Sequence, residues 1–129
     1  MVNDQCNGCD LHQDRDTAYW LCPHEHWYDA QAQCQQLGAN LVTIEDFDEN
    51  SFLSFLLPEA TWIGINDLEQ QGVYDWVDGS DSRYRYWVDD SAPPASSESD
   101  CGGMVTGGRW TIFGCLNQRP SFCEAPHIE

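Results

Sequence analysis

The chain has 129 residues with 22 acidic and 5 basic side chains, which gives a formal charge of −17 at pH 7. This length suits one domain, and no stretch reaches the roughly 20 apolar residues that a membrane-spanning helix needs. All five basic residues are Arg, too few to neutralise phosphates, so we expect no nucleic acid and no anionic membrane as a partner. The residues after Met1 lack a basic segment followed by an apolar one, and we expect a mature or recombinant fragment without an intact signal peptide.

Two helices are predicted first along the chain. Apolar residues recur at helical spacing over 27–37, with Asp29 placed to cap the start and Gly38 to end the helix. A second helix is predicted over about 46–57, and Pro58 stops it. Its buried stripe is formed by Phe52, Leu53, Leu56 and Leu57.

Short strands are predicted over 61–65, about 73–77, 104–106, 109–111 and 121–124. Residues 78–100 are rich in Asp, Ser, Pro and Arg and show neither a helical nor a strand period, which predicts a long surface loop. Loops of this length in small domains are usually binding elements or disordered, and the aromatic residues Tyr84, Tyr86 and Trp87 argue against plain disorder.

Seven cysteines are too many for a reduced cytosolic domain of this size unless they bind metal. Only Cys6 and Cys9 have the Cys-x-x-Cys spacing, and no second pair lies near them, so a zinc module with four cysteines is not expected. We therefore expect disulfides and an extracellular location, either secreted or at the cell surface.

Short motifs recur in a fixed order along residues 19–124. They are Trp27-Tyr28-Asp29-Ala30 before Cys34, Gly38-Ala39-Asn40-Leu41-Val42-Thr43-Ile44, Trp62-Ile63-Gly64-Ile65-Asn66-Asp67, Asp78-Gly79-Ser80, Asp100-Cys101, Gly108-Arg109-Trp110 and Phe122-Cys123-Glu124. In order and spacing this set resembles the C-type lectin-like domain. The resemblance implies an α+β double-loop fold, in which two helices flank small antiparallel sheets, a hairpin joins the chain ends and a long loop hangs from the second sheet. Residues 19–126 would form this domain, and 1–18 an N-terminal extension.

The resemblance also implies the disulfides. Cys34 would pair with Cys123 and Cys101 with Cys115, and members of the long form carry a third bridge near the N-terminus, here Cys9 to Cys22. Cys6 would then be odd, which suggests a disulfide-linked dimer or a link to a removed segment. The alternative is that Cys6 pairs with Cys22.

Sugar-binding members of the family hold calcium in the long loop, and this chain departs from their ligand pattern. The ligand triplet aligns with Ala92-Pro93-Pro94, the acidic position with Ser99 and the Asn-Asp pair with Thr111-Ile112. Calcium needs six to eight oxygen ligands, so the usual sugar site is expected to be lost. A proline bond in the triplet is expected to be cis, as in the family.

Other acidic residues leave the question of calcium in the loop open. Asp89, Asp90, Glu98 and Asp100 are candidates for a rebuilt site, and the alternative is that they are simply solvated. A second loop site of the family retains only Asp67 and Asp100, with Gln71 and Ser99 at its two other ligand positions.

A calcium site away from the loop matches the family pattern better. Its ligands would be Thr43, Glu45, Glu49 and Glu124, because the two Glu of the second helix lie one turn apart and the Cys34 to Cys123 bridge brings Glu124 toward them. This would be a structural Ca²⁺. The alternative is that the Glu residues only favour a helix N-terminus.

Enzymatic motifs are absent from the sequence. His24-Glu25-His26 is not the zinc motif His-Glu-x-x-His, and there is no Gly-x-Ser-x-Gly or phosphate-binding loop. We therefore expect an extracellular module for ligand recognition or adhesion, not an enzyme. It would bind a protein or glycan through its long loop, without the usual calcium-bridged sugar site, using Arg83, Tyr84, Arg85, Tyr86, Trp87 and Arg109.

Two alternatives remain. One is a calcium-dependent carbohydrate-binding lectin with a rebuilt acidic loop site, and the other is a structural protein or one that binds ice or a mineral surface.

Overall fold

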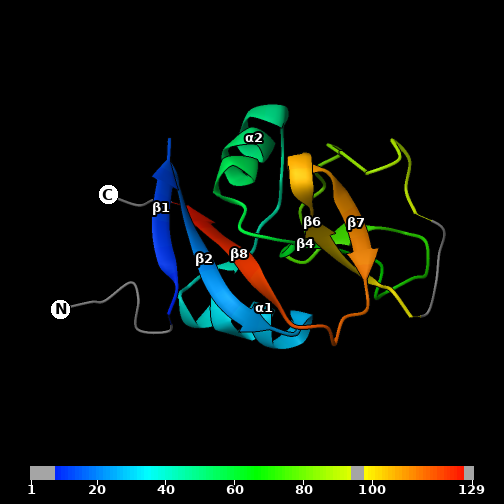
Figure 1. Ribbon diagram of the computed structural model, residues 1–129, viewed down its shortest axis with the longest axis horizontal. Helices are drawn as coiled ribbons and strands as arrows, with labels where there is room; N and C mark the ends of the chain where they lie inside the picture. The colour runs from blue at the N-terminus through cyan, green and yellow to red at the C-terminus, as the bar shows by residue number, and fades with distance from the viewer. Residues whose placement is uncertain (1–7, 94–97, 127–129) are drawn as a thin grey trace.

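The computed structural model describes residues 8–93 and 98–126, and Cys6 and Pro94 lie outside these ranges. The described residues form one eight-stranded sheet, two α-helices and a short 3-10 helix (Figure 1). In chain order the elements are β1 (Asp10–Asp14), β2 (Thr17–Glu25), α1 (Trp27–Gln36), β3 (Asn40–Leu41), α2 (Phe47–Leu56), β4 (Thr61–Asn66), β5 (Asp75–Trp76), β6 (Cys101–Met104), η1 (Thr106–Gly108), β7 (Trp110–Phe113) and β8 (Arg119–Pro126).

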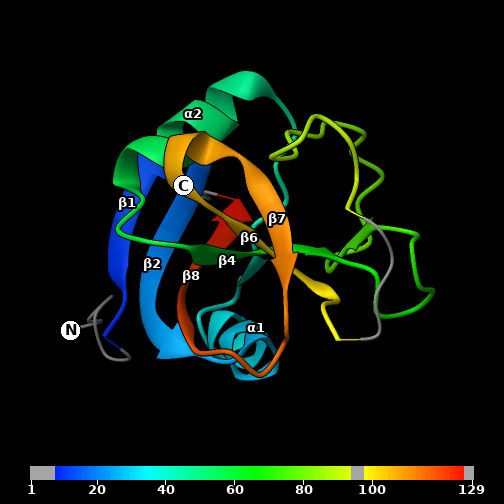
Figure 2. The ribbon, with the colours of Figure 1, turned by 45° about the vertical axis from the view of Figure 1, so that its right-hand side comes forward.

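The sheet joins the early and late parts of the chain. Its strand order is β1-β2-β8-β4-β6-β7, with β3 paired to β8 and β5 paired to β4. The antiparallel pairing of β2 with β8 sets Tyr19 opposite Glu124 and Trp20 opposite Cys123. Figure 1 shows α2 and α1 at opposite ends of this sheet, and Figure 2 shows the segment 78–93 extending away from the sheet on the side of β7. This is the α+β fold that the resemblance implies.

Both predicted helices are present, and one of the predicted caps is wrong. α2 starts after Asp46, whose side chain accepts the Glu49 N–H, and ends just before Leu57 and Pro58. α1 is capped by His26, whose ring accepts the Asp29 N–H at 3.2 Å, so Asp29 is not the cap. Gly38 follows α1 with φ of 76°, the left-handed conformation that a helix end commonly needs.

The predicted strands are present with shifted bounds. The segment 73–77 contributes only Asp75–Trp76, because the Val73 N–H bonds back to Gln70 in a turn. The third predicted strand lies earlier, at Cys101–Met104, and Thr106 instead begins η1. The N-terminal strand β1, within the segment expected as an extension, pairs with β2 from Asp10 opposite Leu21 to Asp14 opposite Thr17.

Two adjoining clusters of buried side chains form the core. One is centred on Trp76, Trp110 and Phe122, and the other on Trp27, Trp62 and the buried cysteines. Three disulfides cross-link the described chain, and they are the pairs implied by the resemblance: Cys9–Cys22, Cys34–Cys123 and Cys101–Cys115. Within the described residues, no helix has the length and apolar character needed to cross a membrane.

Candidate functional site

The long loop is held in place by its own aromatic and Arg side chains. Trp87 is only 5% exposed and packs against Trp110, with ring centroids 5.9 Å apart, and against Tyr74 at 5.0 Å. The backbone joins the same region to β7, since the Val88 N–H bonds to the Trp110 carbonyl and the Trp110 N–H to the Tyr86 carbonyl. Trp87, a candidate ligand-binding residue from the sequence, is therefore part of the core.

Arg85 also serves the loop itself. Its guanidinium donates to the backbone carbonyls of Ser82 and Tyr84 at 2.9 Å and of Tyr74 at 3.2 Å, and it lies 5.6 Å from the Trp76 ring centroid. Burial lowers the pKa of the Arg85 guanidinium. Because three hydrogen bonds join its guanidinium to carbonyls within the domain, Arg85 positions the loop.

Five other candidates lie in the segment 78–93 or contact it, and their side chains are exposed or half-buried. We call this surface the loop face, and it consists of Arg83, Tyr86, Asp89, Asp90 and Arg109. The Arg109 guanidinium lies 4.2 Å from the centroid of the Tyr86 ring, bonds to the Trp87 carbonyl at 3.1 Å and forms an ion pair with Asp90. The structure therefore presents an aromatic ring, a cation and an anion side by side at Tyr86, Arg109 and Asp90. Tyr84 packs behind them, stacked on Tyr86 at 6.4 Å.

The positions that align with the family's loop calcium site form no oxygen-rich cluster. Ala92, Pro93 and Thr111 line a pocket of about 140 Å³ together with Val88, Asp89, Ser91 and Trp110. Of these residues only Asp89 carries a carboxylate, whereas calcium prefers several. Of the two bonds that could carry the expected cis form, Ala92–Pro93 is trans, and Pro93–Pro94 reaches a residue outside the described ranges.

Asp67 and Asp100 lie together at the base of the loop. The Asp67 N–H bonds to the Asp100 carbonyl at 3.0 Å, and the Gln71 side chain donates to the Asp100 carboxylate. The Asp67 side chain is 1% exposed, and its Oδ2 accepts the Gly72 N–H while its Oδ1 has no hydrogen-bond partner. Burial raises the pKa of the Asp67 carboxyl, and the charge of Asp100 acts in the same direction. The structure thus brings together three of the four residues at the family's second loop site, without Ser99.

The other three acidic candidates of the loop lie in two different places. Asp89 and Asp90 belong to the loop face, and Glu98 lines a different pocket of about 360 Å³ with Asp100, Tyr28 and Leu116. Within residues 8–93 and 98–126, no three Asp, Glu, His or Cys side chains are arranged to hold a metal ion together.

A second group of acidic residues surrounds a pocket of about 200 Å³ beside β2, which we call the acidic pocket. Its lining includes Tyr19, Glu45, Asp46, Glu49 and Glu124. Glu124 accepts the Thr43 N–H at 2.6 Å, and Glu49 accepts the Glu45 N–H at 2.7 Å and the Tyr19 hydroxyl at 2.6 Å. Three of the four predicted metal ligands, all but the Thr43 side chain, therefore lie around one pocket. Thr43 contributes its N–H, and its hydroxyl donates to Asp78.

The carboxyl groups of the acidic pocket repel one another. Burial, and next the charge of Glu49, raise the pKa of Glu124 to about 8. Burial also raises the pKa of Glu49, although its hydrogen bond from Tyr19 opposes this effect. Sequence reasoning missed Tyr19, because its contact with Glu49 depends on the β2–β8 pairing and leaves no local signal.

His24, in β2, and His26, at the start of α1, each lie beside a carboxylate. His24 lies 3.1 Å from Glu59 and His26 3.2 Å from Asp29. The two rings thus have different carboxylate partners, one beside β2 and one in the first turn of α1.

Comparison with known proteins identifies the family. Residues 24–125 match the family model described as the lectin C-type domain. The chain belongs to this family. The C-type lectin domain therefore accounts for the double-loop topology, the disulfides and the long loop described above.

Individual relatives extend the comparison. The domain is 29% identical over 111 residues to hepatic lectin of Gallus gallus, covering 84% of this chain and 54% of that protein, so it spans about half the length of that relative. Among solved structures, the mouse scavenger receptor C-type lectin carbohydrate-recognition domain has a TM-score of 0.83 and 26% identity, covering 92% of this chain and 95% of that one. The herring type II antifreeze protein has a TM-score of 0.82 and 27% identity, covering 91% and 96%.

Proposed function

We propose that this C-type lectin domain is an extracellular recognition module that binds a glycan or protein ligand through the loop face, without a calcium ion bridging protein and sugar. The supporting observation is the pocket at Ala92, Pro93 and Thr111, whose lining offers one carboxylate where the sugar-bridging ion needs several. The loop face meanwhile presents Tyr86 and Arg109, residue types that are enriched at binding hot spots. Binding, not catalysis, is the activity that this surface supports.

The rigidity of the loop favours this proposal. A ligand that binds a preformed surface does not have to order it, which lowers the entropic cost of association. Trp87 and Arg85 hold the loop from inside through ring contacts and carbonyl hydrogen bonds, so the loop face is formed before a ligand arrives.

A structural calcium ion at the acidic pocket belongs to the same proposal. Carboxylate oxygens of Glu45, Glu49 and Glu124 are the hard ligands that calcium prefers, and burial together with the charge of Glu49 raises the pKa of Glu124, which a bound cation would counteract. Because no three acidic groups of the described residues are arranged to hold an ion, Ca²⁺ binding requires these side chains to move. The ion would offset the repulsion between carboxylates and stabilise the domain.

A glycan array, probed once with calcium and once with chelator, tests the proposal. We expect any glycan signal to survive the chelator, and the variant Arg109→Ala to lose it. A control variant, Leu116→Ala, changes a side chain that is 73% exposed in another part of the surface and should bind as the wild type does. A signal that chelator abolishes would contradict the calcium-free mode and favour the alternative of a rebuilt acidic loop site at Asp89, Asp90, Glu98 and Asp100. If no glycan binds, capture of an extracellular protein ligand must depend on Arg109, or the proposal is wrong.

The likeness to the herring type II antifreeze protein supports a second candidate, a protein that binds the surface of ice. Thermal hysteresis measured on the purified chain distinguishes the two candidates. A hysteresis gap that grows with protein concentration would favour ice binding over a soluble ligand.

A further inference from the structure

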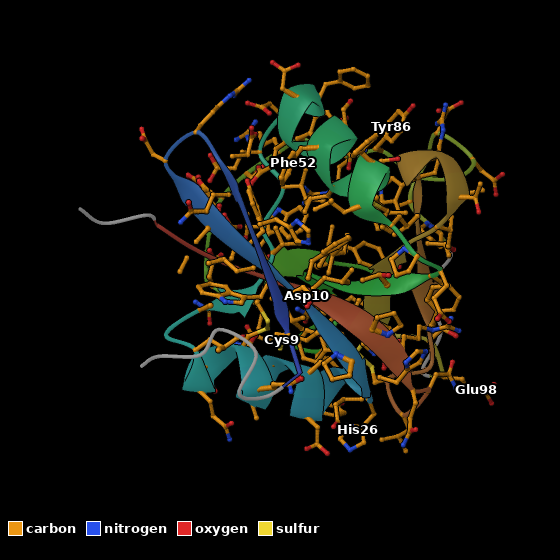
Figure 3. All side chains as sticks on the ribbon, turned by 60° about the vertical axis from the view of Figure 1, so that its left-hand side comes forward. Cys9, Asp10, His26, Phe52, Tyr86 and Glu98 are labelled. Carbon is orange, nitrogen blue, oxygen red and sulfur yellow. A yellow bond between two sulfur atoms is a disulfide. The ribbon has the colours of Figure 1, made fainter. Side chains whose placement is uncertain are left out.

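The outer side of α2 carries a pocket of about 290 Å³ that lies away from both acidic groups and from the family's loop calcium positions. We call it the α2 groove. Phe47, Ser51, Ser54 and Phe55 of α2 line one side, and Tyr86 of the long loop and Gly107 of η1 line the other. Figure 2 shows η1 directly beside α2, and Figure 3 shows Tyr86 next to that helix.

Aromatic rings form the walls of the α2 groove. Phe47, Ser51 and Phe55 are spaced four residues apart, so they follow one face of the helix. Phe47 is 58% exposed and Phe55 88% exposed, and Tyr86 meets Phe47 edge to face with centroids 6.2 Å apart. Arg109 lies over the Tyr86 ring and holds it in place. Exposed aromatic side chains gathered around one hollow mark a binding surface more than scattered ones do.

The floor of the groove is polar and preformed. Buried Asn50 donates to the Gly108 carbonyl at 2.9 Å and accepts from the Trp110 indole at 2.8 Å, which fixes η1 against α2. A Cβ at Gly108 would meet Asn50 and Ser54 at 3.0 Å, so the contact is close, whereas Gly107 faces open space. The hydroxyls of Ser51 and Ser54 have no hydrogen-bond partner among the residues that the structure describes, which leaves two free donor–acceptor groups in the groove.

No charged side chain lines the α2 groove, although 21% of the chain is charged. This sets it apart from the acidic pocket and from the pocket at Glu98 and Asp100, which suit cations. An ionic ligand would therefore find no partner in the groove. Its volume lies at the lower end of the range for small-molecule sites, about 300 to 1,000 Å³, and suits one ring, not a long chain.

We propose that the α2 groove binds one uncharged hexopyranose ring without a metal ion. The apolar C–H face of such a ring contacts Phe47, Phe55 and Tyr86, and its hydroxyls exchange hydrogen bonds with Ser51 and Ser54. Tyr86 belongs to both the groove and the loop face, so a glycan in the groove extends onto the surface assigned above. The inference rests on the proposed function and deepens it by naming a neutral sugar ring and its place.

NMR titration of the full chain in the presence of chelator tests the groove directly. The probes are methyl α-mannopyranoside, methyl β-galactopyranoside and methyl β-glucopyranoside, with cyclohexanol as a ring of the same size that carries one hydroxyl. We expect saturable amide shifts in α2, at Tyr86 and at Gly107 with at least one glycoside. Phe55→Ala should weaken that affinity on the order of tenfold, about 1.4 kcal/mol, and Ser51→Ala should weaken it less. Phe55 is 88% exposed, so its replacement leaves the fold intact.

The results of this titration distinguish a failure of the α2 groove inference from a failure of the proposed recognition function. The control Leu116→Ala should leave the affinity unchanged. Shifts that centre on Val88, Ala92 and Thr111, or an affinity that Phe55→Ala does not alter, would overturn the α2 groove while keeping glycan recognition. Equal affinity for cyclohexanol would overturn the sugar chemistry of the groove. If no glycoside gives a saturable shift but a protein ligand depends on Arg109, the groove inference is wrong and the proposed function stands.

Discussion

The carboxylate of Glu124, in the last strand, accepts a hydrogen bond from the backbone N–H of Thr43 at 2.6 Å, although 81 positions separate the two residues. This contact ties the segment before α2 to β8, directly beside the disulfide at Cys123. It also holds the Glu124 carboxylate within the acidic pocket next to Glu49, where the two negative charges repel each other. The first two predictions follow from this arrangement.

Calcium should stabilise the domain through the acidic pocket. An ion that binds only the folded state adds about 2.7 kcal/mol to the free energy of unfolding at 100 times its dissociation constant. The melting temperature at pH 7.5, measured by circular dichroism, should therefore rise with calcium concentration. Sodium at matched ionic strength should do less, because it screens the charges without strong coordination.

The double variant Glu49→Gln, Glu124→Gln identifies the ion's place. It removes two ligand charges and keeps the side-chain shape, so the calcium response should largely vanish. The matched control is Glu69→Gln, Asp81→Asn, which removes the same charge from exposed positions and should retain the response. A wild-type response in the Gln double variant would place the ion elsewhere, with Asp67 and Asp100 as the next site to test.

Without calcium, the domain should be more stable in mild acid than at pH 8. The pKa of Glu124 is about 8 in the folded chain against 4.5 without the fold, so the folded state binds the proton more tightly. The free energy of unfolding should then fall as the pH rises from about 4.5 to about 8, by at most about 1.4 kcal/mol per unit, and level off above that. Urea unfolding in chelator at several pH values measures this slope. Glu124→Gln should flatten it, and an unchanged slope in that variant would contradict the assignment.

The helices could be predicted from sequence because their signals are local. Asp46 caps α2 through the Glu49 N–H, Pro58 lies just beyond its end, and Gly38 takes the left-handed conformation after α1. Each of these features depends on residues within one helical turn. Capping preferences failed at α1, where the N-cap is His26 and not the expected Asp29, because His is not among the preferred capping residues.

The predicted position of strand β6 was wrong because the packing that places this strand involves residues distant in the sequence. Gly102 and Gly103 resemble a turn in the sequence, yet both are buried strand residues. A Cβ at Gly102 would lie 2.2 Å from the Ile65 side chain, so only glycine permits the close approach of β6 to β4. No pattern near residue 102 carries this information.

In the candidate site, too, the features that depend on neighbouring residues were predicted, and those that depend on distant residues were not. Composition identified the long loop and its aromatic residues, but it did not separate buried Trp87 from half-buried Tyr86, because both are aromatic and lie side by side in the sequence. That distinction depends on Trp110 and Tyr74, which pack against Trp87 from other segments. The acidic pocket likewise needs the β2–β8 pairing to bring Tyr19 to Glu49 and Glu124, and only the family resemblance indicated that Glu124 belongs there.

Replacing Trp87, which is buried in the loop, should lower the stability of the domain, whereas replacing Arg83, which is exposed in the same loop, should not. Trp87→Ala removes a large side chain that is 5% exposed, so we expect a loss of about 3 to 5 kcal/mol in the free energy of unfolding. Arg83→Ala, at an exposed position of the loop face, should stay within about 0.5 kcal/mol of the wild type. Urea denaturation followed by tryptophan fluorescence and circular dichroism compares them. Similar small losses in both variants would show that the loop does not pack as described.

The disulfides should differ in their contribution to stability according to the lengths of chain that they close. Cys34–Cys123 spans a sequence separation of 89 and Cys101–Cys115 one of 14. Loop-closure entropy then predicts losses of about 4 to 5 and about 3 kcal/mol when each pair is replaced by Ala, measured by urea denaturation of the otherwise oxidised chain.

Intact mass before and after reduction should first show an uptake of six hydrogens, for three intrachain bridges, with Cys6 as the remaining thiol or the link of a dimer. Because Cys101 lies next to Asp100, and Cys115 accepts the Trp27 N–H, removal of the shorter bridge should also loosen the base of the long loop. A Cys101→Ala, Cys115→Ala variant with unchanged stability would contradict this role of the bridge.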